Sequence, residues 1–130
     1  MTRPPRFEDA LGPLAAAIMH EVVGMGEASV GDVVAALRHT QGRDHAYTTI
    51  MTVMSRLGRK GVLTRERRGR QYIYRPTASE EALVDRLSGL AVDHLVDRYG
   101  EAALRHFAVR LADLDPETRR QLEALAENQG

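Results

Sequence analysis

The stretch of sequence that decides the fold is residues 46–76, AYTTIMTVMSRLGRKGVLTRERRGRQYIYRP. Apolar residues recur at three- and four-residue spacing in its first part, which predicts a helix over residues 47–59 with one buried face. That face carries Ile50, Val53, Met54 and Leu57. The pattern then changes, and two segments rich in strand-forming residues, 62–67 and 70–75, flank the pair Arg68-Gly69. A glycine at such a position is typical of a tight turn, so the stretch predicts a helix followed by a β-hairpin.

Two further helices are predicted upstream of this stretch. The first has Gly12 as its N-cap and Pro13 at its first position, and we expect the glycines at 24 and 26 to end it. The second begins at Ser29, whose hydroxyl can cap the helix together with Asp32 three residues later. Their apolar faces carry Leu11, Leu14, Ala15, Ile18 and Val22 in the first, and Val30, Val33, Val34 and Leu37 in the second. The order helix, helix, helix, hairpin is that of a winged helix-turn-helix.

Helices also continue downstream of the hairpin. Ser79 can cap a fourth helix, Gly100 breaks it, and Asp115-Pro116 opens a last helix after a short one. We therefore predict a mostly α protein with a small β-hairpin wing (class α+β), in which a winged helix-turn-helix is followed by a helical dimerisation tail. The expected division is a winged-helix DNA-binding domain over residues 1–78 and a helical dimerisation region over residues 79–130.

The charges of the chain are segregated along it. The 130 residues are formally neutral, with 18 Lys and Arg against 18 Asp and Glu. Residues 1–78 hold 12 basic and seven acidic residues, whereas residues 79–130 hold six and 11. Between residues 43 and 75 there are nine cations and two anions. A local excess of this size is typical of a surface that binds a polyanion, because a merely solvated face usually mixes both signs.

The exposed face of the predicted helix 47–59 carries hydroxyl side chains near its start and cations near its end. A recognition helix places its N-terminal half against base edges in the major groove, where threonine hydroxyls and methyls contact bases. We therefore predict base contacts from Thr48, Thr49, Met51 and Thr52. From this helix and the hairpin tip we predict phosphate contacts by Tyr47, Ser55, Arg56, Arg59, Lys60, Arg67, Arg68 and Arg70.

The hairpin offers two further expectations. Its tip carries only positive charge and suits contact with a DNA backbone or minor groove, although such charge can also protect a hairpin edge from aggregation. Tyr72 and Tyr74 alternate onto one strand face. Such a pair packs on a core more often than it stacks on bases, and we expect core packing for both.

The tail carries more apolar side chains than the preceding domain would cover. Large exposed apolar surfaces mark interfaces, so we predict a homodimer built by the tail. Two recognition helices related by a two-fold axis would then meet half-sites about one turn of DNA apart, or a multiple of it. The predicted interface residues are Leu83, Leu87, Leu90, Leu95, Leu104, Phe107, Leu111, Leu122 and Leu125.

Two segments, LGPLAAAIM at residues 11–19 and the stretch quoted above, carry a recognisable pattern. It consists of Tyr47, Thr48, Thr49, Ile50, Thr52, Arg56, Leu57, Lys60, Gly61, Tyr72, Tyr74 and Pro76. On these residues the chain resembles the penicillinase-repressor family, the BlaI/MecI/CopY type of bacterial winged-helix repressor. The resemblance implies a homodimer that binds dyad-symmetric operators in double-stranded DNA and represses nearby genes. Copper-sensing members have a cysteine-rich tail, and this chain without cysteine lacks that chemistry.

The resemblance also implies a route for release of DNA. In β-lactam-responsive members a membrane sensor protease system triggers cleavage of the repressor just before a phenylalanine in its tail. The corresponding bond here is His106–Phe107, without the asparagine usual before that phenylalanine, and the sensor system would be a partner. We favour the other role for Phe107, a buried anchor of the dimer interface, because a folded helix resists a protease until it opens locally.

Enzyme and metal chemistry are not indicated by the sequence. His20-Glu21 begins like a zinc-binding HExxH motif, but Gly24 stands where the second histidine is needed. The other histidines lack metal-ligand spacing, so we expect no metal, no cofactor and no catalytic residue. No apolar run approaches the roughly 18 residues of a membrane span, and no signal-peptide core is seen. We therefore expect no membrane insertion and a cytoplasmic protein.

Two other functions fit the same fold. One is a winged-helix regulator that senses a small ligand directly, and the other is a protein–protein adaptor whose basic face binds an acidic partner. Salt-dependent binding to duplex DNA, with a preference for one dyad sequence, distinguishes the repressor from the adaptor.

Overall fold

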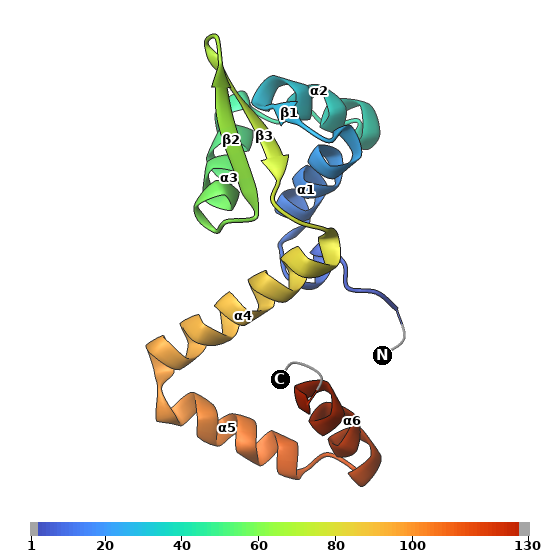
Figure 1. The fold of residues 1–130 in the computed structure, drawn as a ribbon, viewed down its shortest axis with the longest axis vertical. Helices are drawn as coiled ribbons and strands as arrows, with labels where there is room; N and C mark the ends of the chain where they lie inside the picture. Colours follow the sequence, from blue (N-terminus) through green and yellow to red (C-terminus); the bar gives the residue numbers. More distant parts are fainter. Residues whose placement is uncertain (1–2, 128–130) are drawn as a thin grey trace. The chain divides into compact units, whose positions relative to one another are not determined.

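The computed structural model describes residues 3–127 and divides the chain into two compact units, residues 1–89 and residues 90–130. The first unit contains η1 (Phe7–Asp9), α1 (Pro13–Met25), β1 (Ala28–Ser29), α2 (Val30–Gln41), α3 (Tyr47–Arg59), β2 (Leu63–Arg68) and β3 (Gln71–Pro76). Helix α4 (Glu80–Tyr99) begins in the first unit and continues into the second, which adds α5 (Glu101–Ala112) and α6 (Pro116–Glu127) (Figure 1). The predicted winged helix-turn-helix is confirmed.

The helix ends follow the local signals in the sequence closely. Ser29 Oγ accepts from the backbone N–H of Asp32, and the Asp32 carboxylate accepts from the N–H of Ser29, both at 3.0 Å, which is the predicted capping box of α2. Helix α3 begins and ends where predicted. Helix α1 runs one residue past Gly24 and ends at Gly26, whose φ of 81° is a conformation that glycine adopts without strain.

The hairpin pairs one residue later in the chain than predicted. Arg68 pairs with Gln71, so the two turn residues are Gly69 and Arg70 instead of Arg68 and Gly69. Gly69 has a φ of 64°, and a positive φ at the first central residue is the geometry of a type II′ turn. Glycine therefore takes the first turn position and moves both strands by one residue.

A third strand, β1, was not predicted. It is two residues long and adds to the free edge of β3, with Ala28 opposite Tyr74 and Ser29 opposite Ile73, which gives the antiparallel order β1-β3-β2. Two residues are too short for a hydrophobic period, so no sequence pattern marks this strand.

The core of the first unit lies between α1, α2, α3 and the sheet. Its buried residues include Ile18, Met19, Val22, Val33, Leu37, Ile50, Met54, Leu57, Val62 and Tyr74. The expected core packing is correct for Tyr74, which is 1% exposed, and wrong for Tyr72, which is 40% exposed. The two rings share a strand face, but Tyr72 lies nearer the hairpin tip, and only Tyr74 belongs to the core.

The start of α4 belongs to the first unit, so the division lies within this helix instead of before it. Leu83, Val84 and Leu87 are buried in the first unit's core. Arg86 donates to the carbonyl of Gly61 at 2.6 Å, and the Glu80 carboxylate accepts from the N–H of Phe7 at 2.9 Å. These contacts hold the first two turns of α4 against η1 and the turn between α3 and β2.

The second unit is helical and buries no side chain among its described residues, 90–127. Gly100, with a φ of 57°, separates α4 from α5. Asp115 caps α6 as predicted, accepting from the N–H of Thr118 at 2.8 Å. Among residues 3–127, no helix is long and apolar enough to cross a membrane.

Candidate nucleic-acid interface

Helix α3 divides cleanly into a buried face and a solvent face. Ile50, Met54 and Leu57 are at most 2% exposed, whereas all four residues predicted to contact bases are exposed. Those four, Thr48, Thr49, Met51 and Thr52, therefore lie together on the solvent face of the N-terminal half of α3. An α-helix with such a face fits the width of a DNA major groove.

The Thr52 hydroxyl already has one partner. Its Oγ1 donates to the carbonyl of Thr48, one turn earlier, at 2.8 Å. A hydroxyl has one donor and two acceptor lone pairs, so Thr52 presents acceptor capacity and its methyl group to solvent. This arrangement suits a base amino group or a thymine methyl.

The C-terminal half of α3 carries the predicted phosphate contacts of the helix. Arg56, Arg59 and Lys60 are exposed, Ser55 is half-buried, and Tyr47 at the other end of the helix is 53% exposed. None of the three cations forms an ion pair with another residue of the described range 3–127. Their charge is therefore available to an external anion.

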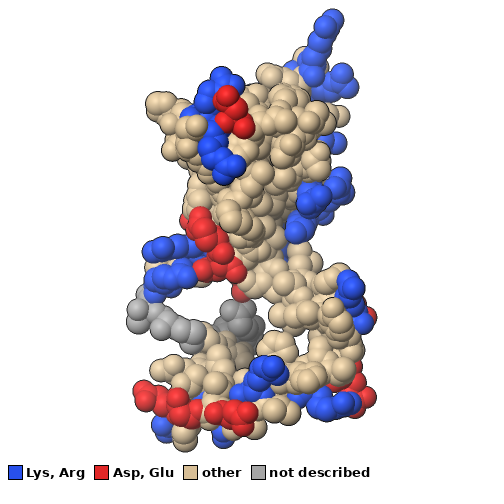
Figure 2. Space-filling model, turned by 180° about the vertical axis from the view of Figure 1, so that it is seen from behind, with Lys and Arg blue, Asp and Glu red and all other residues tan. Residues whose placement is uncertain are grey.

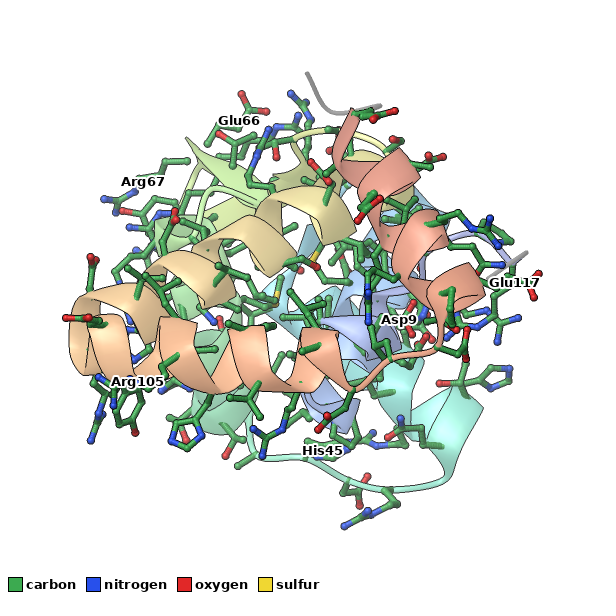
Figure 3. All side chains as sticks on the ribbon, turned by 90° about the horizontal axis from the view of Figure 1, so that it is seen from below. Asp9, His45, Glu66, Arg67, Arg105 and Glu117 are labelled. Atoms are coloured by element: carbon green, nitrogen blue, oxygen red, sulfur yellow. The ribbon has the colours of Figure 1, made fainter. Side chains whose placement is uncertain are left out.

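The hairpin has two chemically different faces because strand side chains alternate. Arg65 and Arg67 share a face with Tyr72 and Tyr74, whereas Glu66 and Arg68 lie on the other face with Ile73 and Arg75. Figure 3 shows Glu66 and Arg67, neighbours in sequence, pointing in different directions from the strand.

The Glu66 face of the hairpin carries a four-residue ion-pair network. Glu27, in the turn before β1, and Glu66 each pair with both Arg68 and Arg75, with both Arg75 contacts at 3.1 Å. Hydrogen bonds from Arg68 and then Arg75 lower the pKa of Glu27, and the bonds to Glu27 and Glu66 raise the pKa of Arg68. The charge of Arg68, a predicted phosphate contact, is therefore already balanced by carboxylates.

The other tip arginines have no such partner. Arg67 Nε donates to the carbonyl of Gly69 at 3.2 Å, and neither Arg67 nor Arg70 pairs with a carboxylate among residues 3–127. Figure 2 shows Lys and Arg side chains gathered at the top of the molecule, where the hairpin tip lies. Of the predicted tip contacts, Arg67 and Arg70 keep their charge available.

Arg65 is a candidate that the sequence analysis missed. Its Nη1 donates to the Tyr74 hydroxyl at 3.2 Å, which raises its pKa, and its guanidinium carbon lies 4.0 Å from the centroid of the Tyr72 ring. The signal in the sequence was the two-residue alternation, which places Arg65 and both tyrosines on one face once the strands are paired.

The predicted interface residues of the tail fall into two groups. Leu83 and Leu87 are 0% and 5% exposed because the core of the first unit covers them, so they offer no surface to a second chain. Leu122 is half-buried beside α5, in a groove of about 460 Å³. The remaining residues, together with the proposed cleavage position His106, are exposed: Leu90, Leu95, Leu104, Phe107, Leu111 and Leu125.

Metal ligands are not brought together in the described part of the chain: residues 3–127 contain no group of three His, Asp or Glu side chains that could hold a metal ion. His20 Nε2 contacts the Glu8 carboxylate and lies 4.0 Å from that of Glu80.

The chain matches the family model of the penicillinase repressor over residues 11–128. The transcriptional regulator BlaI of two Mycobacterium tuberculosis strains is 39% identical over 93 residues, 68% of this chain and 65% of the relative, so the chain spans about two thirds of these relatives' length. The solution structure of the DNA-binding domain of the repressor BlaI is 23% identical, with a TM-score of 0.48, covering 62% of this chain and 92% of that one. The complex structure of hsRosR-S1, 12% identical with a TM-score of 0.50, covers 92% of this chain and 91% of that one and shares the fold. By the extent of the family match, this chain belongs to the penicillinase repressor family.

Proposed function

We propose that the protein is a sequence-specific DNA-binding transcriptional repressor that acts as a homodimer on dyad-symmetric operators. The observation that carries this proposal is the solvent face of α3, where exposed threonines are followed by cations that have no carboxylate partner among residues 3–127. Family membership and 39% identity to transcriptional regulators named BlaI support the same function.

The proposed division of labour follows the geometry of α3 and the hairpin. Thr48, Thr49, Met51 and Thr52 read base edges, because they lie on the N-terminal half of the solvent face. The phosphate contacts hold α3 and the hairpin in register along the duplex without reading sequence. They are Tyr47, Ser55, Arg56, Arg59, Lys60, Arg67 and Arg70, with a smaller share for the carboxylate-paired Arg68.

The proposed dimer interface is built by residues 90–127. Leu104, Phe107 and Leu125 are 55%, 53% and 49% exposed, and no described side chain of this unit is buried. Residues 90–127 bury no side chain fully, so they gain little to offset the conformational entropy lost on folding, and a second copy would cover their exposed apolar side chains. A two-fold pair would also place two α3 helices on one duplex, which is the arrangement that a dyad operator requires.

The proposed function can be tested directly by letting the protein select its own operator. Double-stranded oligonucleotides that the full-length protein retains from a random pool are sequenced, and the enriched sequence is then tested by fluorescence anisotropy against a scrambled duplex. We expect one enriched dyad sequence and an affinity about 10³-fold or more above the scrambled duplex at physiological salt. Equal affinity for both duplexes would contradict sequence-specific repression and would favour the acidic-partner adaptor.

Release by proteolysis is the less favoured part of the proposal. His106 and Phe107 lie inside α5, so the peptide bond between them is reached by a protease only when the helix opens. Phe107 as an interface anchor explains its 53% exposure in the single chain without any protease. A membrane sensor protease is therefore proposed as a partner only if cutting the His106–Phe107 bond dissociates the dimer.

A further inference from the structure

A groove of about 490 Å³ runs between α3 and β2 in the first unit. Its α3 wall is formed by Ser55, Gly58 and Arg59. Its sheet wall is formed by Leu63, Thr64, Arg65 and Tyr74. The groove thus combines the guanidinium groups of Arg59 and Arg65 with the hydroxyl groups of Ser55 and Tyr74.

Arg65 is held in this groove by two tyrosines. Its Nη1 donates to the Tyr74 hydroxyl at 3.2 Å, and its guanidinium stacks 4.0 Å from the centre of the Tyr72 ring. Tyr74 is itself 1% exposed, so the group that receives the hydrogen bond is fixed by the core. A guanidinium fixed by a stack and one hydrogen bond keeps its other N–H donors for a ligand and loses little entropy on binding.

The opposite wall supplies a second cation without a counter-charge. Arg59 forms no side-chain hydrogen bond or ion pair with another residue of the described chain, and none of the described residues that line the groove is acidic. The reverse holds on the other face of the same hairpin, where Glu27 and Glu66 neutralise Arg68 and Arg75. The charges on the Glu66 face of the hairpin therefore neutralise one another, whereas the groove face keeps a net positive charge.

We propose that this groove is a phosphate-binding subsite in which Arg59 and Arg65 hold one phosphate group from opposite walls and the Ser55 hydroxyl donates to it. Two like charges that line one groove without a carboxylate repel each other, and a phosphate between them would offset that repulsion. Arginine forks match phosphate oxygens in two-point contacts, which a tyrosine-stacked guanidinium is oriented to make. Tyr72 and Tyr74 are positioning residues that act through Arg65.

The phosphate group has two sources with the same chemistry, a DNA backbone diester or a free phosphate ion. The inference rests on the proposed function for the first source and is independent of it for the second. Two measurements on the full-length protein separate them. One follows binding to the selected duplex as a function of salt, and the other follows the arginine side-chain NMR signals during titration with inorganic phosphate in the absence of DNA.

The variants are chosen to change one charge on each face. Arg65→Gln and Arg59→Gln each remove one groove charge, whereas Arg75→Gln removes one charge from the balanced face of the same hairpin and serves as the matched control. Tyr74→Phe keeps the buried ring and removes only the hydroxyl that holds Arg65. All are checked for an unchanged circular dichroism spectrum and unfolding temperature.

If the group is a DNA phosphate, Arg65→Gln and Arg59→Gln each lower duplex affinity roughly tenfold and reduce the slope of log affinity against log salt by about 0.9. Arg75→Gln leaves the slope unchanged, Tyr74→Phe has a smaller effect than Arg65→Gln, and Arg65→Lys restores the slope but not the full affinity. If the group is free phosphate, the Arg59 and Arg65 signals shift on titration and Arg65→Gln binds the duplex as tightly as the wild type.

The inference is overturned if the Arg59 and Arg65 variants keep the wild-type salt slope and the NMR signals of both arginines do not shift with phosphate. It is also overturned if Arg75→Gln changes the salt slope as much as Arg65→Gln. Failure of the proposed function looks different. In that case the wild-type protein selects no duplex at all, while the phosphate titration still reports on the groove.

Discussion

Arg68 at the tip of the hairpin is ion-paired with Glu27, which lies 41 positions earlier in the chain, in the turn before β1. The same carboxylate pairs with Arg75 at 3.1 Å. Through these contacts the turn before β1 is tied to the hairpin, and part of the positive charge of the hairpin is neutralised. Arginines that look equivalent in the sequence therefore differ in what they offer to an external anion.

The first prediction compares Arg68, the last residue of β2, with Arg70, which lies in the turn. Arg70→Ala should reduce the slope of log DNA affinity against log salt by about 0.9, because an unpaired cation releases one counterion from DNA. Arg68→Ala should reduce the slope by less, since its charge is already balanced by Glu27 and Glu66. Anisotropy titrations on a scrambled duplex at several salt concentrations measure both slopes. Equal slopes for the two variants would show that the ion pairs of Arg68 with Glu27 and Glu66 break when the protein binds DNA.

The second prediction concerns base reading by Thr52. Thr52→Ala should weaken binding to the selected operator by about 1–3 kcal/mol and binding to scrambled DNA hardly at all, as for loss of a base contact. Thr52→Val keeps the methyl group and replaces the hydroxyl with a second methyl, whereas Thr52→Ser keeps only the hydroxyl, so the pair identifies the group that reads the base. An equal loss on operator and scrambled duplex would assign Thr52 to the backbone instead.

The third prediction concerns assembly by the second unit. Leu104→Asp combined with Phe107→Asp should convert the dimer to a monomer and lower operator affinity by about 10²–10⁴-fold, because the second half-site is no longer linked to the first. As the control, Gln121→Asp adds a charge at an exposed polar position of α6 and should leave the mass of the dimer unchanged. Sedimentation velocity at micromolar concentration gives the mass. A wild-type monomer with full operator affinity would remove the dimer from the proposal.

The fourth prediction tests the His106–Phe107 bond. A protease recognition sequence inserted after His106 allows the bond region to be cut in the purified protein. We expect the cut to separate α6 and the end of α5 from α4, to abolish the dimer and to reduce operator affinity to that of the monomeric variant. Cut protein that stays dimeric and binds as tightly as uncut protein would exclude cleavage here as a release mechanism.

The fifth prediction is a pH dependence at the start of the chain. Hydrogen bonds from Arg3 and from the N–H of Arg6 lower the pKa of Asp9 from 3.8 to about 2. A lowered carboxyl pKa adds stability above pH 3.8 that is lost as the pH falls through about 2. Asp9→Asn should therefore lower the unfolding temperature at neutral pH, and the difference from the wild type should shrink below pH 3.8. A difference that stays constant with pH would mean that the charge of Asp9 contributes nothing.

Much of the candidate site was predictable because it depends on local chemistry. A helix with one apolar stripe has one solvent face, so the exposure of Thr48, Thr49 and Thr52 followed from the spacing of Ile50, Met54 and Leu57. Helix boundaries followed from caps and glycines, whose effects act within a few residues. The tail helices were predicted from the same local signals.

What the sequence did not determine depends on which segments meet. Neither β1 nor the pairing of Glu27 with Arg68 has a local pattern, because each exists only after the turn before β1 meets the hairpin. Leu83 and Leu90 look equivalent in the apolar pattern of α4, yet one is 0% and the other 44% exposed. The sequence by itself determined the order of the α-helices and the two hairpin strands, the solvent face of α3 and the excess of positive charge. The tertiary structure decided which charges are neutralised and which apolar residues stay exposed, because burial and ion pairing depend on contacts between segments far apart in the chain.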